Sequence, residues 1–404
     1  MAKQKNIPKL RFPEFNEDWS KGSLEKKNFS KGKGISKADI AENGETACIR
    51  YGELYTTYGE TIDEVVSRTN VDKNELILSE ANDVIIPASG ESQLDIATAS
   101  CVLKSGIALG GDLNIIKTEN NGVFLSYYLN SKKKIEIARL AQGISVVHLY
   151  STQLSQLELL LPKIPEQTKI ASFFSTIDKK TQALKNNKEL LEEYKKGVSQ
   201  KLFSQAIRFK NDKGKDFPEW EELELSEFLI PTLREVSTPK DKYLAIGIRS
   251  HCKGTFQKPN SDPSKISMDK LFTVKENDLI VNITFAWEGA IALVKKKDEG
   301  GHVSHRFPTY TFNRDLVIHE FFQFVFVQKE FRNILDLISP GGAGRNRVLS
   351  KKEFLKIKWF FPKVDEQTKI ADFLSSIDKK IGLIDKKLND TEQWKKGLLQ
   401  KMFC

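Results

Sequence analysis

The chain has 404 residues, of which 39% are hydrophobic and 29% are charged, and its formal net charge is +9. The length indicates two or three domains, and the composition excludes a wholly disordered chain. The longest dense apolar stretch, Phe321 to Val327, is too short to span a membrane.

The positive charge permits a nucleic-acid partner, although basic proteins also use such charge simply to stay soluble. The lysines at the start of the chain have no apolar segment behind them, so we expect no signal peptide. Four cysteines lie far apart without a Cys-x-x-Cys pair, which indicates neither a disulfide framework nor a zinc site. We therefore expect a cytoplasmic protein.

The first globular part covers residues 1–162 and is expected to mix helices with strands. A short β-like run, Val84 to Ile86, lies among clusters of Gly, Asn and Asp. An amphipathic helix is predicted at about 122–141, followed by the loop Ala141-Gln-Gly-Ile-Ser and a strand.

A long helix is predicted at 163–207. Its apolar residues recur at alternating spacings of three and four over about four heptads, which is typical of a coiled coil. Pro165 suits the helix N-terminus, and Pro162 keeps the preceding strand from continuing. Polar breaks at Lys188 and Lys195 would leave this helix marginal alone, so it needs a partner helix.

The second globular part, at 208–362, has the same mixed character. Its β-like runs are Leu279 to Ile283, Ala290 to Val294 and Thr309 to Phe312, and its amphipathic helix is expected at about 316–338. The next loop, Ser339-Pro-Gly-Gly-Ala-Gly-Arg-Asn-Arg, is longer and more basic than its counterpart in the first half.

A second long helix, at 363–404, repeats the first. Residues 161–180 and 361–380 are identical at fourteen of twenty positions, and 195–204 resembles 395–404. The globular parts also open alike, because Arg11-Phe-Pro-Glu-Phe corresponds to Asp216-Phe-Pro-Glu-Trp. A period of 200 residues is too long for a solenoid and indicates a tandem duplication. Similar tails with different globular parts predict a shared tail partner and different targets.

The fold class is predicted as α+β (mixed α/β), with two globular parts that are each followed by a long helix. We expect the two helices to form an antiparallel coiled coil with pseudo-two-fold symmetry, which gives two equivalent surfaces for a partner. The alternative is that each apolar stripe packs on its own globular part. The predicted seam consists of Ile170, Phe174, Ile177, Leu184, Leu191, Val198, Leu202, Ile370, Leu374, Ile377, Ile381, Ile384, Leu388, Leu398 and Met402.

No catalytic motif is apparent. Gly341 to Arg347 lacks the end of a phosphate-binding loop, no Gly-x-Gly-x-x-Gly follows a strand, and the Asn/Asp-Pro-Pro-Tyr/Phe motif of amino-methylating DNA enzymes is missing. His302 and His305 have no carboxylate or cysteine near them in sequence, which disfavours a metal site. The sequence therefore indicates a binding protein.

The repeated Pro-x-x-x-Glu-Gln-x-x-Ile-Ala motif, followed by a long helix with Ile-Asp, resembles the specificity subunit of type I restriction–modification systems. The matching residues are Pro162, Glu166, Gln167, Ile170, Ala171, Ile177 and Asp178, then Pro362, Glu366, Gln367, Ile370, Ala371, Ile377 and Asp378. The opening Pro8-Lys-Leu-Arg-Phe-Pro-Glu-Phe is also similar to starts common in this family. The resemblance covers essentially the whole chain.

This resemblance implies target-recognition domains at 1–162 and 208–362 and conserved spacer helices at 163–207 and 363–404. Each recognition domain would read half of a split, asymmetric site in double-stranded DNA. The helices would dock two modification (methyltransferase) subunits and, through them, restriction (endonuclease/translocase) subunits. The implied partner-docking motif consists of Glu166, Gln167, Glu366 and Gln367.

The resemblance also implies that this chain catalyses nothing and holds no cofactor or metal. S-adenosylmethionine, ATP and Mg would be bound by the partner subunits. Two alternative functions stay open, a stand-alone DNA methyltransferase or endonuclease and a coiled-coil scaffold protein. The first would need a catalytic site that the sequence does not display, and the second would not bind DNA even with methyltransferase partners present.

The candidate DNA-binding residues come from loop chemistry and not from the resemblance, because recognition domains in this family vary greatly. Polar and basic side chains in glycine-flanked loops suit base edges and phosphates. The alternative for each is a solvated charge or a structural hydrogen bond. The candidates are Arg50, Tyr51 and Tyr55 in the first part, and Arg249, His251, Lys253, Arg306, Arg345 and Arg347 in the second.

Overall fold

The computed structural model describes residues 6–25, 28–143, 145–341 and 347–404. They form two compact units: unit 1 runs to Lys188 and also includes Ile384–Cys404, and unit 2 is Glu189–Leu383. The boundaries between these two units lie inside the two long helices, at 188–189 and 383–384. The reason is that each half of a long helix packs with a different globular part.

Unit 1 contains a five-stranded sheet in the order β2-β10-β6-β8-β4 and a three-stranded sheet in the order β5-β3-β9. Two-stranded ribbons join β1 to β12 and β11 to β7. The strands are β1 (Ser20–Ser23), β2 (Phe29–Lys31), β3 (Thr46–Ile49), β4 (Thr61–Ile62), β5 (Ser67–Thr69), β6 (Asp83–Pro87), β7 (Ser89–Gly90), β8 (Ser100–Val102), β9 (Ala108–Leu109), β10 (Leu113–Ile116), β11 (Val147–His148) and β12 (Glu158–Leu161).

The helix predicted at 122–141 is confirmed, with a π-helical segment (Leu129–Lys133) in its middle. The predicted strand at Val84 to Ile86 lies within β6, every residue of which is buried. The α-helices of this globular part are α1 (Glu53–Thr56), α2 (Gln93–Ile96), α3 (Gly122–Tyr128), α4 (Lys134–Leu140) and α5 (Ser151–Leu154).

Unit 2 contains a four-stranded sheet, β14-β22-β19-β20, a five-stranded sheet, β15-β18-β21-β16-β17, and the ribbon β13-β23. The strands are β13 (Glu221–Glu224), β14 (Leu229–Pro231), β15 (Glu235–Ser237), β16 (Tyr243–Ile248), β17 (Thr255–Ser261), β18 (Lys270–Thr273), β19 (Leu279–Val281), β20 (Ile291–Leu293), β21 (His302–Val303), β22 (Thr309–Phe312) and β23 (Lys358–Phe361). The three strands predicted here correspond to β19, β20 and β22.

The single helix predicted at 316–338 is in fact two, because the chain breaks at 326–328. The helices of this globular part are α7 (Leu225–Phe228), α8 (His319–Val325), α9 (Lys329–Leu337) and α10 (Lys351–Leu355). Phe321, Phe322 and Phe331 are fully buried in one core cluster, so the break lets both short helices turn their aromatic faces inward.

The two long helices are α6 (Ile164–Phe203) and α11 (Val364–Met402), close to the predicted ranges. None of the helices in the described part of the chain has the length and apolarity that a bilayer span requires. In unit 1, Lys185 pairs with Glu392 and Lys188 with Asp385, so the start of α6 and the end of α11 run antiparallel. In unit 2, the end of α6 meets the start of α11 through Lys195 and Asp378.

The predicted seam residues are all buried or half-buried. At its ends, however, the seam packs into the globular cores. Ile170, Phe174 and Ile177 belong to the core cluster of unit 1, and their repeat equivalents belong to that of unit 2. At these positions the apolar stripe packs on its own globular part, as in the alternative that the sequence leaves open.

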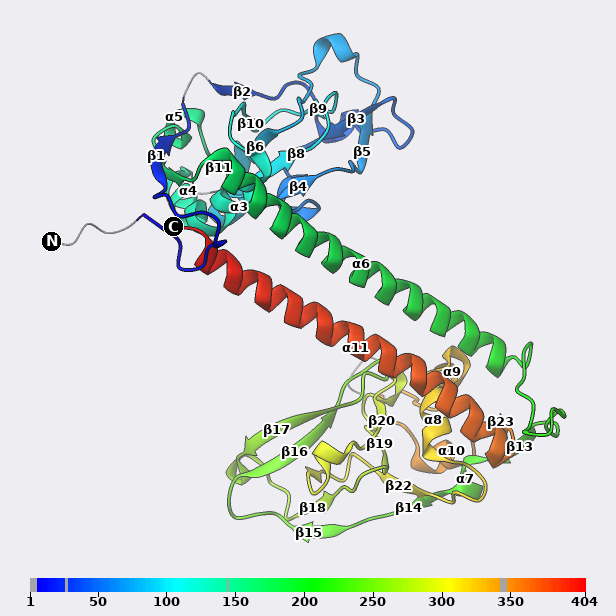
Figure 1. The fold of residues 1–404 in the computed structure, drawn as a ribbon. Helices are drawn as coiled ribbons and strands as arrows, with labels where there is room; N and C mark the ends of the chain where they lie inside the picture. The colour runs from blue at the N-terminus through cyan, green and yellow to red at the C-terminus, as the bar shows by residue number, and fades with distance from the viewer. Residues whose placement is uncertain (1–5, 26–27, 144, 342–346) are drawn as a thin grey trace. The chain divides into compact units, whose positions relative to one another are not determined.

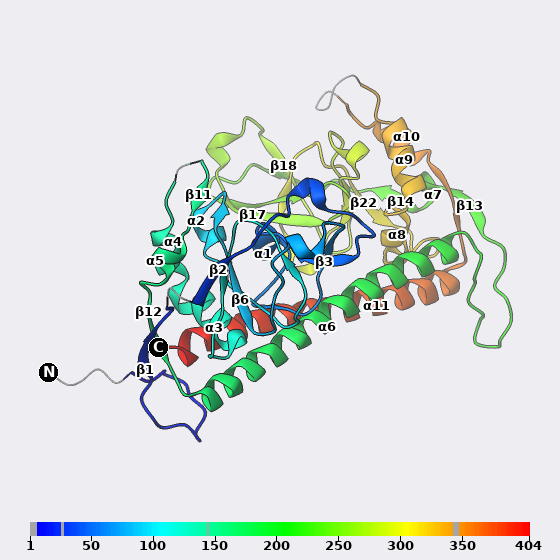
Figure 2. The ribbon, with the colours of Figure 1, turned by 90° about the horizontal axis from the view of Figure 1, so that it is seen from above.

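The end of α11 completes the core of unit 1. Figures 1 and 2 both place the C-terminus beside β1, where the Leu10 amide donates to the Lys401 carbonyl over 2.9 Å. Phe403 is 2% exposed, and its ring centroid lies 5.5 Å from that of Phe124, 5.8 Å from that of Phe174 and 5.9 Å from that of Tyr128. In unit 2 the corresponding Phe203, at the end of α6, contacts the ring of Phe321 at 5.5 Å.

We predict that Phe403→Ala destabilises unit 1 by about 3–5 kcal/mol, because it leaves a cavity among packed rings. Amide hydrogen exchange should accelerate in α3 and the first half of α6 but not in α8 and α9. The matched variant is Phe203→Ala, which should perturb unit 2 by less, because that ring is only half-buried. Equal acceleration in both units of the Phe403 variant would contradict the assignment.

Candidate nucleic-acid interface

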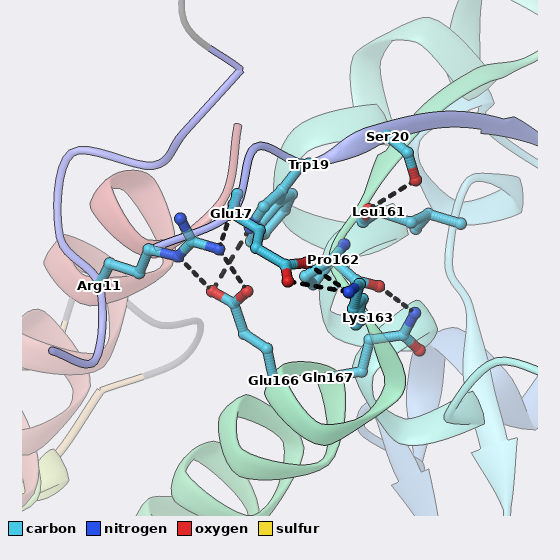
Figure 3. Close-up of polar contacts among 9 residues, drawn as sticks. All are labelled: Arg11, Glu17, Trp19, Ser20, Leu161, Pro162, Lys163, Glu166 and Gln167. Atoms are coloured by element: carbon cyan, nitrogen blue, oxygen red, sulfur yellow. Dashed lines mark hydrogen bonds and ion pairs between the residues drawn. The ribbon is translucent and has the colours of Figure 1, made fainter. Parts of the chain in front are cut away.

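A buried ion pair fixes the start of each long helix. In unit 1 the Arg11 guanidinium donates through Nε and Nη2 to the two carboxylate oxygens of Glu166, each over 2.7 Å (Figure 3). Glu166 is 2% exposed, and the Trp19 indole approaches the same carboxylate at 3.4 Å. The hydrogen bonds to Glu166 raise the pKa of Arg11, so its guanidinium stays charged at physiological pH.

The next side chain ties the helix to the globular part. Gln167 donates to the Pro162 carbonyl over 2.9 Å and accepts from the Asn121 amide, also over 2.9 Å, at the start of α3 (Figure 3 shows the first of these bonds). Burying a side-chain amide is tolerable only when its donor and acceptor are both satisfied, which is the case here. The orientation of α6 relative to α3 is thereby fixed.

Unit 2 repeats this arrangement. Arg208 donates to both carboxylate oxygens of Glu366 at 3.1 and 2.8 Å, and Gln367 donates to the Pro362 carbonyl and accepts from the Ile318 amide. The expected role of Glu166, Gln167, Glu366 and Gln367 in docking a partner therefore needs correction. All four side chains are 0–2% exposed with internal partners, so they stabilise the units and leave no atom for a docked subunit.

The ion pair also corrects the alignment of the repeats. Sequence comparison placed Arg11 opposite Asp216, but the residue with the same contacts is Arg208. Phe209 likewise stacks edge-on against Phe373 at 5.6 Å, as Phe12 does against Phe173 at 5.7 Å. The second copy has an extra turn closed by a bridge between Lys210 and Asp216, which moved its arginine upstream in sequence.

The three candidates of the first half come together. Arg50, Tyr51 and Tyr55 line one cavity of about 710 Å³ in unit 1, together with Lys37 and Glu91. Arg50 is not free, because its Nε and Nη2 donate to the buried carboxylate of Glu53 over 3.0 and 2.8 Å.

The two tyrosines of this cavity are half-buried. Burial raises the pKa of Tyr55, so its hydroxyl is protonated at neutral pH and can donate a hydrogen bond. The cavity therefore offers phenol groups from Tyr51 and Tyr55 beside an arginine whose charge is already balanced.

Three candidates of the second half lie on one hairpin. Arg249, His251 and Lys253 are exposed in the β16–β17 connection, where His251 (φ +60°) and Cys252 (φ +55°) adopt the left-handed conformation. Such a conformation costs an L-residue about 1–2 kcal/mol, and strained residues of this kind cluster at functional sites.

This hairpin is held by the β19–β20 turn, residues 282–290. The His251 and Cys252 amides donate to the Glu288 and Gly289 carbonyls over 2.7 and 2.8 Å. The Ser250 hydroxyl donates to the Glu288 carboxylate over 2.6 Å. The backbone is thus fixed while the side chains of His251 and Lys253 are exposed and accessible to a ligand.

Arg306 and Arg347 contact the same turn. Arg306 donates to the Thr284 hydroxyl over 3.3 Å, and Arg347 lies 4.9 Å from the centre of the Trp287 ring. Arg347 also donates to the Ser339 and Asp336 carbonyls and pairs with the Asp336 carboxylate. Several hydrogen-bond donors of its guanidinium group are therefore already used within the protein. Arg345 lies outside the described residues.

The turn itself was missed by sequence reasoning. The Glu288 carbonyl holds the His251 amide and the Trp287 ring lies against Arg347, yet neither Trp287 nor Glu288 is basic or flanked by glycine on both sides. The available signal was Gly289, which ends the turn with a left-handed φ of +75°. This glycine, placed between two strands that the sequence predicts, would have indicated a structured turn.

Cys48 and Cys101 are buried free thiols, and Cys252 is a half-buried one. Burial raises the pKa of Cys48 and Cys252 to about 11 and that of Cys101 to about 12, so these thiols stay protonated near neutral pH. Within the described ranges, no group of three or more His, Cys, Asp and Glu side chains is placed to hold a metal ion.

The chain is similar to a known protein family over most of its length. A family model described as the type I restriction modification DNA specificity domain matches residues 16–193 and 219–393. Two type I restriction enzyme specificity subunits from Methanocaldococcus jannaschii are similar to this chain. The MjaX subunit is 25% identical, over 72% of this chain and 70% of its own length. The MjaVIII subunit is 22% identical, over 81% of this chain and 80% of its own length. The crystal structure of the S subunit of a type I restriction–modification system from M. genitalium covers 98% of this chain and 99% of its own, with a TM-score of 0.63 and 17% identity.

We predict that His251→Gly unfolds at a higher temperature than His251→Ala, with a difference of about 1 kcal/mol in the free energy of unfolding. Both variants remove the imidazole, but only glycine adopts a φ of +60° without steric cost. Thermal unfolding followed by circular dichroism measures the difference. Equal stability of the two variants would show that the hairpin is not strained at this residue.

Proposed function

The chain belongs to the type I restriction–modification DNA specificity family, as a specificity subunit with two recognition domains, and from this premise we propose how it recognises DNA. Each recognition domain contacts one half of a split, asymmetric site in double-stranded DNA. Two observations together support this most: the family model matches the chain twice, and the candidate side chains differ between the two matched parts. The phenols of Tyr51 and Tyr55 serve one half, and the basic hairpin tip serves the other.

Affinity and specificity come from different contacts in this proposal. Lysine and arginine contacts to phosphates supply most of the affinity and make it dependent on salt. Side chains that reach base edges supply the sequence preference. His251 and Lys253 suit these roles in unit 2, because their backbone is fixed and their side chains are exposed.

We also propose that α6 and α11 pair along their length as an antiparallel coiled coil with an approximate two-fold axis. The support is reciprocal: Lys195 pairs with Asp378, and Lys395 pairs with Asp178, each over 2.6 Å. These contacts join the same two positions of the repeat with the helices exchanged. The helices would then act as a spacer that sets the gap between the half-sites.

The equivalent helix surfaces would dock two methyltransferase subunits and, through them, restriction subunits. Tyr194 and Trp394 occupy the same position of the repeat and are each 54% exposed, so both long helices present a large aromatic ring at equivalent places. They replace the buried Glu–Gln motif as the docking residues that we propose.

The chain is proposed to contribute no catalytic group of its own, with S-adenosylmethionine, ATP and Mg held by the partners in the cytoplasm. We predict that the purified chain transfers no methyl group from labelled S-adenosylmethionine to DNA, and that transfer begins when methyltransferase subunits are added. Transfer by the chain alone would instead favour a stand-alone enzyme.

The double variant His251→Ala/Lys253→Ala should weaken binding of the assembled complex to its site by about 1–3 kcal/mol, because it removes groups that reach base edges or phosphates. Methylome sequencing should show a relaxed or lost preference in one half-site only. Tyr51→Ala is the matched variant, and its effect should fall on the other half-site. Changes in the same half-site for both variants would contradict the assignment.

Inserting four residues after Leu184 in α6, with four more after Leu388 in α11, should lengthen the paired helices by about 6 Å. We predict a longer gap between half-sites, by one or two base pairs at about 3.4 Å each, with both half-site sequences retained. Methylation mapping measures this. Altered half-sites with an unchanged gap would remove the spacer role.

A further inference from the structure

A cavity of about 440 Å³ opens between the five-stranded sheet of unit 2 and the 282–290 turn. Tyr243, Phe256, Phe285 and Phe307 line it, and none of these four rings is fully buried. Small-molecule sites are typically concave, mostly apolar and of about 300–1,000 Å³. The volume therefore suits a planar ring of the size of a nucleobase and excludes a folded peptide.

The position of the Phe256 ring in the cavity depends on one glycine, Gly247. A Cβ atom at Gly247 of β16 would lie 2.4 Å from the nearest atom of the Phe256 ring, so only glycine lets this ring lie against the strand. The ring thus stands as a flat surface beside the cavity. Stacking of a base on such a surface contributes about 1–3 kcal/mol.

The cavity also has unsatisfied polar groups. The Nδ1 atom of His302 is buried and has no hydrogen-bond partner among the described residues. Glu288 accepts from Ser250 through Oε2, while its Oε1 has no bond in the part of the chain that the structure describes. A buried polar atom without a partner is costly and needs an explanation. His302 and Glu288 both line the cavity, so their side chains can offer polar atoms to the edge of a ligand there.

Two cations lie against the Phe256 ring, and one of them, Lys258, lines the cavity. The Arg249 guanidinium and the Lys258 ammonium each lie 5.4 Å from the centre of the Phe256 ring. Neither has an acidic partner within the described ranges, whereas Lys270 of the same sheet pairs with Glu235 at 2.7 Å. Positive charge without a counter-charge, placed beside a stacking surface, suits a phosphate group.

We propose that this cavity binds a single nucleotide, with the base against the aromatic side chains and the phosphate on Arg249 and Lys258. The hydrogen-bonding edge of the base meets the polar side chains of His302 and Glu288 that line the cavity. The nucleotide has two possible sources, a free mononucleotide or a nucleotide that has left the stack of a bound DNA strand. The second source rests on the proposed function, and the first does not.

The first arm of the test uses the purified full chain and the four deoxynucleoside 5′-monophosphates, followed by isothermal titration calorimetry. We expect saturable binding of at least one, weakened fivefold or more by Arg249→Ala and by Lys258→Ala. Lys270→Ala is the matched control, because that lysine lies on the same sheet outside the cavity, and it should leave the affinity unchanged.

The second arm uses a DNA duplex with one unpaired 4-thiothymidine and a fully paired duplex with the same label. Photocrosslinks from the unpaired nucleotide to Tyr243 or Phe256, absent with the paired duplex, would identify a nucleotide of DNA as the ligand. Mononucleotide binding without such crosslinks would identify the free nucleotide.

Two outcomes would overturn the proposal. One is the lack of both mononucleotide binding and cavity crosslinks, and the other is binding that Arg249→Ala and Lys258→Ala leave unchanged. If the assembled complex still methylates a split site in either case, the proposed function stands and only the cavity proposal fails.

Discussion

The packing of a helix end into a globular core that is far away in sequence is the constraint on which the rest of the structure depends. Phe403 fills a space among the rings of Phe124, Tyr128 and Phe174, and that space would otherwise be a cavity. Neither long helix is therefore a free linker, because each one is part of two cores. This explains why the tails of the two repeats are alike while the globular parts differ. Equivalent residues of the two tails must each pack into a globular core.

Half-buried ion pairs set the register of this packing more than they stabilise it. Lys395 lies between Asp178 and Glu60, at 2.6 and 3.2 Å, and Tyr127 donates to the same Asp178. Burial raises the pKa of Tyr127, which keeps the donor protonated. Desolvation offsets much of the attraction in such a network, but a shifted register would leave these partly desolvated carboxylates unpaired. In unit 2, Lys195 packs on Phe324 and pairs with one carboxylate, Asp378, so the network is simpler there.

Periodicity and repetition in the sequence predicted the elements that obey local rules. Both long helices and strands such as β6 and β22 lie where apolar spacing placed them. Three features could not be predicted, because they depend on contacts between distant residues. The burial of Glu166 by Arg11 follows from tertiary packing, the correspondence of Arg208 with Arg11 is hidden by an inserted turn, and the split of each helix between two units follows from core packing. In the candidate interface, basic residues were found by type, whereas Trp287 and Glu288 act through geometry.

The two halves hold their candidate residues in different ways, and this affects how each can change. In unit 2 the hairpin is fixed by its backbone amides, so His251 and Lys253 can be replaced without breaking a bond that supports the fold. In unit 1 the Arg50 side chain satisfies Glu53, which is 5% exposed, so replacing the arginine would leave a buried carboxylate with less compensation. A new sequence preference is thus accessible in unit 2 through single substitutions at the tip. In unit 1 it requires either a change at the tyrosines or a paired change of Arg50 and Glu53.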